Sequence, residues 1–111
     1  MAARQNEGMI MKMTEDLTRE AFLEQLNSKF LMRPANAEPL ELELVSVTEL
    51  PSAPGQDQFS VIFLAPLNAP MAQGVYQLEH PQLGTFGIFL VPVGRDPQGL
   101  QYEALFNRVG L

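Results

Sequence analysis

The stretch from Phe86 to Asn107 constrains the fold of this chain more than any other part of the sequence. It contains two runs of strand-forming residues, 86–93 and 100–107, separated by Gly-Arg-Asp-Pro-Gln-Gly at 94–99. Proline early and glycine late in a short connection are typical of a tight turn, so the stretch predicts an antiparallel hairpin. The first run is apolar at odd and even positions alike. Because successive side chains of a strand point to opposite faces, both faces of this strand must be covered.

Four earlier segments have the period-two pattern of strands. They span residues 29–33, 40–49, 58–65 and 75–80. In the second of these, leucines alternate with glutamates as far as Leu44. The alternation then slips, because Val45 and Val47 are apolar where polar residues are expected. The slip predicts either a β-bulge near Val45 or an outer face that is covered there.

One short helix is predicted before the first strand. Thr18 can cap its N-terminus, because the hydroxyl can accept a hydrogen bond from an early backbone N–H. Leu17 and Phe22 have the spacing of a hydrophobic staple at the same end. We expect the helix to run for about three turns and to end at Asn27, and a helix this short is stable only if its apolar stripe docks on another part of the protein.

Residues 15–111 are long enough for a single domain, whereas residues 1–14 are polar and irregular and are expected to form a flexible leader. Short connections between successive strands favour antiparallel pairing of each strand with its neighbour in sequence. The predicted fold class is therefore mainly β, a small antiparallel six-stranded barrel or a two-layer sandwich, with one short N-terminal helix. We favour the barrel, with the helix capping one end, because closure removes exposed strand edges.

Charge and composition exclude several classes of function. The chain has 7 Lys and Arg against 13 Asp and Glu, a net charge of -6. Its basic residues are scattered, so neither a nucleic acid nor an anionic membrane is an expected partner. The chain has no cysteine, which removes disulfides and thiolate chemistry and fits a location in the cytoplasm. No apolar run approaches the roughly 20 residues of a membrane-spanning helix.

No set of residues has the spacing of a catalytic, cofactor or metal site. His80 is the single histidine, and its neighbour Glu79 would point to the opposite face of a strand. We expect His80 to be structural, at the turn that begins with Pro81. Glu41 and Glu43 share one strand face, an arrangement that can serve glycoside cleavage but is more typical of a solvated face. The glycines form no phosphate loop, and the serines form no nucleophile motif.

Surplus apolar residues on strand faces indicate an interface with another protein. If Phe86, Ile88 and Leu90 fill the core, Phe89 and Val91 point outward from the same strand. The two valines of the slipped strand and the polar tip of the hairpin are added to this surface. The candidate interface residues are Val45, Val47, Phe89, Val91, Arg95 and Asp96.

The tip of the hairpin carries the polar pair Arg95-Asp96. The pair could form a recognition tip on an exposed hairpin. Alternatively, Asp96 supports the turn by accepting a backbone N–H, and Arg95 is solvated or pairs with a carboxylate. Pro92 has no N–H to donate within a ladder, so we expect a bulge or a sheet edge just before the tip.

Three strings of the sequence are distinctive. They read Val-Tyr-Gln-Leu-Glu-His-Pro-x-Leu-Gly at 75–84, Phe-Leu-Val-Pro-Val-Gly-Arg-Asp at 89–96 and Tyr-Glu-Ala-x-Phe-Asn at 102–107. Together with the helix over 22–26, they resemble a bacterial family of small all-β proteins that is catalogued only as a domain of unknown function. Genes of this kind often lie near phage-tail-like genes. The resemblance implies an assembly or accessory role, and it brings no catalytic residue with it.

The function favoured by these patterns is a non-enzymatic interaction or assembly module that binds a protein partner, or forms a homo-oligomer, through an apolar sheet face. The resemblance adds a phage-tail-like accessory or structural role, in the cytoplasm or within a tail-like particle. A small-ligand-binding β-barrel is the first alternative, because aromatic and methionine side chains could line a pocket. A hydrolase that uses His80 is the second. We expect no enzymatic activity and no cofactor.

Overall fold

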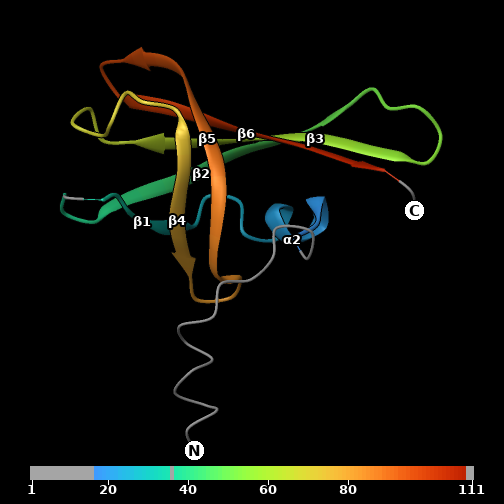
Figure 1. The fold of residues 1–111 in the computed structure, drawn as a ribbon, viewed down its shortest axis with the longest axis horizontal. Helices are drawn as coiled ribbons and strands as arrows, with labels where there is room; N and C mark the ends of the chain where they lie inside the picture. Colours follow the sequence, from blue (N-terminus) through green and yellow to red (C-terminus); the bar gives the residue numbers. More distant parts are fainter. Residues whose placement is uncertain (1–16, 36, 110–111) are drawn as a thin grey trace, which may run out of the picture.

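The computed structural model describes residues 17–35 and 37–109. The described part contains one short helix and six strands, so the prediction of a mainly β fold is confirmed (Figure 1). The elements are α2 (Arg19–Leu23), β1 (Lys29–Arg33), β2 (Leu40–Leu50), β3 (Gln56–Ala65), β4 (Gly74–His80), β5 (Gly84–Asp96) and β6 (Gly99–Val109). The leader predicted over residues 1–14 lies outside the described residues.

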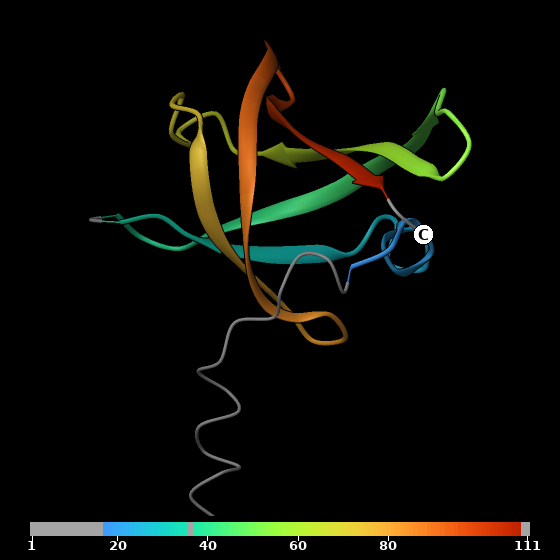
Figure 2. The ribbon, with the colours of Figure 1, turned by 45° about the vertical axis from the view of Figure 1, so that its right-hand side comes forward.

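The six strands close into a barrel in the order β1-β2-β3-β6-β5-β4, and each neighbouring pair is antiparallel (Figure 2). The barrel that we favoured over the sandwich is thus the observed fold. One expectation was wrong, since β3 does not pair with β4, its neighbour in sequence. It pairs with β6 along its whole length, from Gln56↔Val109 to Ala65↔Leu100. The connection over residues 66–73 is too long for a tight hairpin and leads across one end of the ring.

The ring is unevenly closed, because β5 and β6 separate beyond their shared hairpin. Their ladder ends at Val91↔Glu103, after which, in the described part of the chain, β5 pairs with β4 and β6 pairs with β3. Phe22 of α2 fills the inside of this opening. Its ring centroid lies 6.4 Å from that of Phe86 on β5 and 5.5 Å from that of Phe106 on β6. The helix therefore caps the barrel where the two strands part.

Helix α2 begins where the sequence predicts and ends earlier than expected. The Thr18 hydroxyl caps it by accepting a hydrogen bond from the backbone N–H of Ala21 at 3.1 Å. The helix ends at Leu23 and is followed by turns up to Asn27. Asn27 adopts a left-handed conformation with a φ of 69°, and its N–H donates to the carbonyl of Leu44 on β2. This bond to the sheet draws the chain out of the helix and into β1.

Two tyrosines hold the connection over residues 66–73 against the other end of the barrel. The hydroxyl of Tyr102 donates to the carbonyl of Pro70, and that of Tyr76 donates to the carbonyl of Ala72, each at 2.5 Å. The two rings lie 5.9 Å apart between centroids. Burial, with a smaller contribution from Tyr76, raises the pKa of Tyr102 to about 12. This phenol therefore remains protonated and continues to donate throughout the physiological range.

Both strand irregularities predicted from the sequence are present. The register of β2 against β3 shifts between Leu44 and Ser46, and that of β5 against β6 shifts between Pro92 and Gly94. After each shift, the alternation is reversed, because side chains alternate with a period of two. Residues that would have pointed outward without the shift then point inward.

The β5–β6 turn is tighter than the connection predicted over residues 94–99. The ladder continues to Asp96↔Gly99, which leaves a two-residue turn. Gly99 has a φ of 152°, and a Cβ at this position would collide with the carbonyl oxygen of Ala65 at the end of β3. Only glycine allows the hairpin to approach β3 this closely.

Candidate functional site

Between Phe86 and Val91, strand β5 separates core residues from outward residues by alternation. Phe86, Ile88 and Leu90 are buried, as predicted. Phe89 is 51% exposed, and Val91 is half-buried on the same outer side. The other six phenylalanines of the chain are at most 8% exposed, so Phe89 is exceptional among residues of its type.

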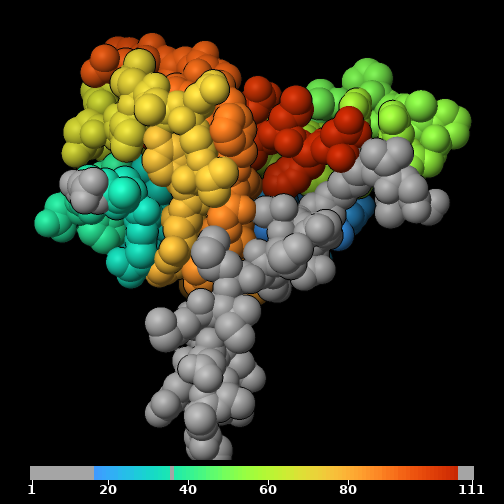
Figure 3. All heavy atoms as spheres, viewed as in Figure 1, coloured from blue at the N-terminus to red at the C-terminus, as the bar shows by residue number. Residues whose placement is uncertain are grey.

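Strand β4 adds a second exposed apolar residue beside Phe89. Val75 is 72% exposed and pairs directly with Phe89 in the β4–β5 register. Figure 3 shows the two strands side by side on one surface of the molecule. We call the outward residues Val75, Phe89 and Val91 the β4–β5 face. Sequence reasoning did not include Val75, although its alternation with the inward Tyr76 indicates an outward position.

The β4–β5 face is almost free of charge. Between Gly74 and Gly94, the sequence contains no Lys or Arg and a single carboxylate, that of Glu79. Arg33 of the neighbouring β1 donates two hydrogen bonds to this carboxylate. The hydrogen bond from Arg33 is the main cause that lowers the pKa of the Glu79 carboxyl, and the same bond raises the pKa of Arg33. The charge at this edge of the face is thus neutralised on the protein itself. At the opposite edge, the carboxylate of Glu103 on β6 lies opposite Val91 and accepts a hydrogen bond from the hydroxyl of Ser60.

The two candidate residues on β2 do not join this face. Val47 lies opposite Val61 and packs against the core, so our placement of Val47 on the outer side was wrong. The bulge at Val45 is the cause, because it returns the residues after it to the inward phase. Val45 itself is half-buried on β2. Two strands separate β2 from β5 in either direction round the ring, so the candidate interface residues form no single patch.

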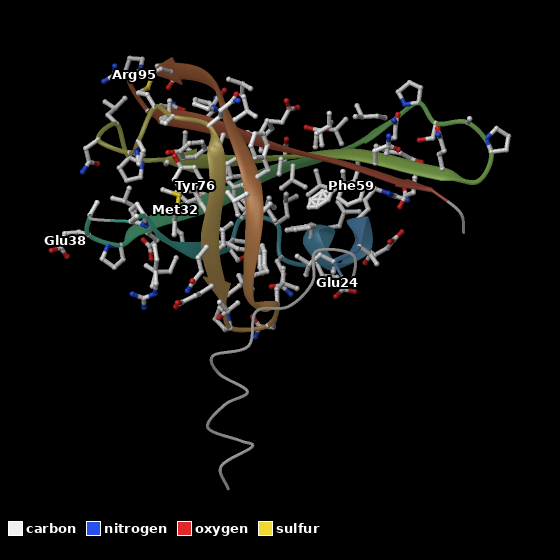
Figure 4. All side chains as sticks on the ribbon, in the orientation of Figure 1. Glu24, Met32, Glu38, Phe59, Tyr76 and Arg95 are labelled. Atoms are coloured by element: carbon white, nitrogen blue, oxygen red, sulfur yellow. The ribbon has the colours of Figure 1, made fainter. Side chains whose placement is uncertain are left out.

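The hairpin tip has the geometry of a supported turn. A carboxylate oxygen of Asp96 accepts a hydrogen bond from the backbone N–H of Gln98 at 2.9 Å. Arg95 is exposed, and Figure 4 shows it at the hairpin end of β5, away from α2. Asp96 thus plays the turn-supporting role that the sequence allowed. Arg95 lies opposite the buried Leu100, beyond the bulge of β5, so it is exposed at the end of the hairpin on the side away from the β4–β5 face.

His80 links the end of β4 to the segment that follows α2. Its Nδ1 accepts hydrogen bonds from the backbone N–H groups of Gln82 and Leu83, at 3.0 and 3.3 Å. Its Nε2 lies 2.9 Å from the hydroxyl of Ser28, which donates its own proton to the carbonyl of Gln25 at 2.6 Å. Because the hydroxyl proton is directed at Gln25, Nε2 must carry the ring hydrogen and donate to Ser28.

This hydrogen-bond direction is opposite to that of a nucleophile and its base. A catalytic histidine accepts the proton of the serine that it activates, whereas here the imidazole donates to Ser28. Burial lowers the pKa of His80, and the ring lies against Phe30 with 4.3 Å between centroids. The arrangement fits a neutral, structural histidine. The Ser28–His80 contact itself could not be anticipated, because the two residues are 52 positions apart in sequence.

Glu41 and Glu43 lie on the outer wall formed by β1 and β2. Glu43 forms an ion pair with Lys29 at 3.6 Å, and Glu41 is exposed opposite Leu31. Within residues 17–35 and 37–109, no three His, Asp or Glu side chains are grouped closely enough to hold a metal ion. The two carboxylates are therefore placed as a solvated strand face usually is.

A shallow hollow of about 460 Å³ lies at the connection between β2 and β3. The hydroxyl of Ser52 in its wall donates to the carbonyl of Leu50 and accepts from the N–H of Gln58. These groups are occupied in shaping the loop. The hollow is lined by Glu49, Leu50, Pro51, Ser52 and Gln56.

Comparison with protein families gives one match, to a domain of unknown function, DUF6916, over residues 17–106. The chain belongs to the DUF6916 family. The match begins at Leu17, just before α2, and covers the barrel except for the last three residues of β6. Neither the curated proteins nor the solved structures include a significant match to this DUF6916 chain. Within its described part, no helix has the length and apolar character needed to cross a membrane.

Proposed function

We propose that this DUF6916 protein is a non-enzymatic interaction module that binds another protein chain through the β4–β5 face. The observation that carries the proposal is the exposure of Phe89 beside Val75, on a strand pair whose inner face already supplies the core. Aromatic side chains exposed next to aliphatic ones are enriched in protein interfaces. Their burial against a partner would remove from water apolar surface that folding leaves exposed.

The two alternatives receive less support from the geometry. For a ligand-binding barrel, the inward side chains would have to leave room, whereas those described pack into one continuous hydrophobic cluster. For a hydrolase, His80 would have to accept a proton, whereas both of its ring nitrogens are engaged with Ser28 and the turn after β4. An interaction module requires neither a cavity nor a proton acceptor.

We further propose that the protein is an accessory or structural protein of a bacterial, phage-tail-like particle that is assembled in the cytoplasm. This part of the proposal is supported by the sequence resemblance alone. Such a role needs a stable small domain that presents one adhesive surface, and the barrel with its β4–β5 face has that form.

The proposal is tested with the full chain as bait in an extract of its native host. The wild type is compared with Phe89→Ser, and Leu26→Ser serves as the matched control, because Leu26 is also exposed, at 40%, but follows α2. We expect the partner protein, identified by mass, to be retained by the wild type and by Leu26→Ser and lost with Phe89→Ser. Retention by Phe89→Ser at the wild-type level, or no retained protein with any bait, would contradict the proposal.

A further inference from the structure

We infer that the partner bound by the β4–β5 face is a second copy of this chain, related by a two-fold axis that passes near the Val75–Phe89 pair. The inference rests on the proposed function and adds the identity of the partner.

The first argument is the overall charge. Each chain carries a net charge of -6, so two copies repel each other wherever their acidic surfaces meet. The outer wall of β1 and β2, for example, presents the exposed carboxylate of Glu41. The β4–β5 face has no charged side chain of its own. A second copy could therefore lie across the centre of this face without bringing carboxylates together.

The second argument is that few charges surround the face. Arg33 and Glu79 balance each other along the edge next to β1. On the edge next to β6, Glu103 lies opposite Val91, and its carboxylate accepts a hydrogen bond from the hydroxyl of Ser60. A face shaped for a charged partner would keep an excess of the opposite sign around its centre. An uncharged apolar centre is complementary to itself, which is the requirement of a two-fold interface.

The third argument concerns geometry and size. The β4–β5 ladder runs from Gly74↔Leu90 to His80↔Gly84 and is about 20 Å long at the usual strand rise. Two such sheet faces pack about 10 Å apart with their strands inclined by about 30°. Near the axis, Phe89 of each copy would lie against Val75 and Phe89 of the other. With its rim, an interface of this size removes on the order of 1,000 Å² from water, the lower limit for specific association. We therefore expect a dimer of micromolar rather than nanomolar affinity.

The chain has no tryptophan, so Phe89→Trp gives a single reporter inside the face. The tryptophan fluorescence of this variant of the full chain, and its quenching by iodide, are measured from nanomolar to high micromolar protein concentration. Sedimentation of the wild type is measured over the same range. We expect a solvent-exposed spectrum at low concentration, and a blue-shifted, protected one as the mass doubles. An exposed spectrum at every concentration would overturn the inference. A protected spectrum with a constant monomer mass would also overturn it, since another segment of the same chain would then cover the face.

A charge exchange at Val75 tests the two-fold arrangement. Val75→Lys and Val75→Glu place like charges near the axis of each homodimer, so each alone should associate at least about tenfold more weakly than the wild type. An equimolar mixture should recover association, because opposite charges then face each other. Leu26→Ser should associate as the wild type does, and thermal unfolding verifies that every variant is folded. Failure of the mixture to recover would overturn the two-fold arrangement.

The same variants separate this inference from the proposed function. If the wild type is monomeric at every concentration but retains a different protein that Phe89→Ser loses, the second-copy inference falls and the proposed function stands. If Phe89→Ser changes neither self-association nor retention, both fall.

Discussion

The inner and outer faces of β4 and β5 are built from the same residue types and have opposite surroundings. On the inner face, Leu78, Phe86 and Leu90 are fully buried. On the outer face, Val75 and Phe89 are 72% and 51% exposed. The inner residues are explained by folding, because burying apolar surface contributes about 25 cal/mol per Å² to stability. The outer residues receive little of this stabilisation within one chain, so their apolar character calls for a different explanation.

The outer wall of β1 and β2 shows how the same barrel treats an ordinary solvated surface. Lys29 and Glu43 form an ion pair across the two strands, and Glu41 is exposed to solvent. On this wall, the outward side chains other than Leu31 are mostly polar, and Phe30, Leu42 and Leu44 face the core, as expected for an antiparallel sheet. The β4–β5 face departs from that rule within the same sheet. The contrast supports the proposal that the β4–β5 face contacts another chain.

The largest expected effect concerns the inner face. Phe86 is fully buried, and its ring lies 6.4 Å from that of Phe22 and 6.4 Å from that of Phe30. Phe86→Ala should lower the free energy of unfolding by about 3–5 kcal/mol, because it removes a buried ring and leaves a cavity. Denaturant unfolding followed by circular dichroism measures the change. A loss below about 1 kcal/mol would mean that the inner face is not the folding core.

A second large effect is expected where the β5–β6 hairpin touches β3. In Gly99→Ala, the added Cβ would collide with the carbonyl oxygen of Ala65, and alanine at a φ of 152° is strained. Backbone strain and overpacking together should cost about 3 kcal/mol or more. Gly55→Ala is the matched control, because Gly55 also has a positive φ, of 81°, but a Cβ added there, on the open β2–β3 loop, would meet no heavy atom within 4 Å. Thermal unfolding should rank Gly99→Ala as the less stable variant, and equal stabilities would refute the close approach.

A pH-dependent effect is expected at the turn that joins β4 to β5. Burial lowers the pKa of His80, so the unfolded chain takes up a proton at a higher pH than the folded chain does. The contribution of His80 to stability is therefore complete above the unfolded pKa of about 6.5 and is lost as the pH falls through the lower folded value. The backbone N–H groups of Gln82 and Leu83, which donate to Nδ1, would then face a protonated ring.

Denaturant unfolding between about pH 7.5 and about pH 5, a range that spans the unfolded pKa, measures this loss. His80→Ala should remove the dependence and should itself cost about 1–3 kcal/mol at neutral pH, because the backbone N–H groups of Gln82 and of the buried Leu83 lose their acceptor. Ser28→Ala retains both of these bonds and should keep the pH dependence. If His80→Ala followed the same pH curve as the wild type, the neutral ring would not be the source of the effect.

Local features of the fold could be predicted because their causes lie within a few residues. The slip after Leu44 predicted a bulge or a covered outer face, and the missing N–H of Pro92 predicted a bulge or a sheet edge; the structure has a bulge at each place. Alternation along β5 assigned Phe86 to the core and Phe89 to the surface, also in agreement with the structure. Each of these features follows from the period of a strand or from the chemistry of a single residue.

Features that join distant segments could not be predicted. The pairing of β3 with β6 depends on a connection held by the hydroxyls of Tyr76 and Tyr102, and neither bond has a local signature. The contact between Ser28 and His80 likewise depends on the closure of β4 against β1. The candidate site could be predicted in part. Alternation along β5 predicted that Phe89 points outward. The position of Val75 beside it depends on the register between β4 and β5, which has no local signature in the sequence.

The smallest expected effect on stability is that of Phe89→Ala, which completes the comparison with Phe86→Ala. Phe89 is half exposed and forms a cross-strand pair with Val75. Pairs of this kind contribute roughly 0.2–1 kcal/mol, so the monomer should lose no more than about 1 kcal/mol of unfolding free energy. Unfolding must be measured at low micromolar concentration, where association adds little to the stability of the folded chain. Repeating it at a roughly hundredfold higher concentration should stabilise the wild type and leave Phe89→Ala unchanged, because only a face that retains its aromatic ring links folding to association. Equal stabilisation of both proteins would place the adhesive surface elsewhere on the barrel.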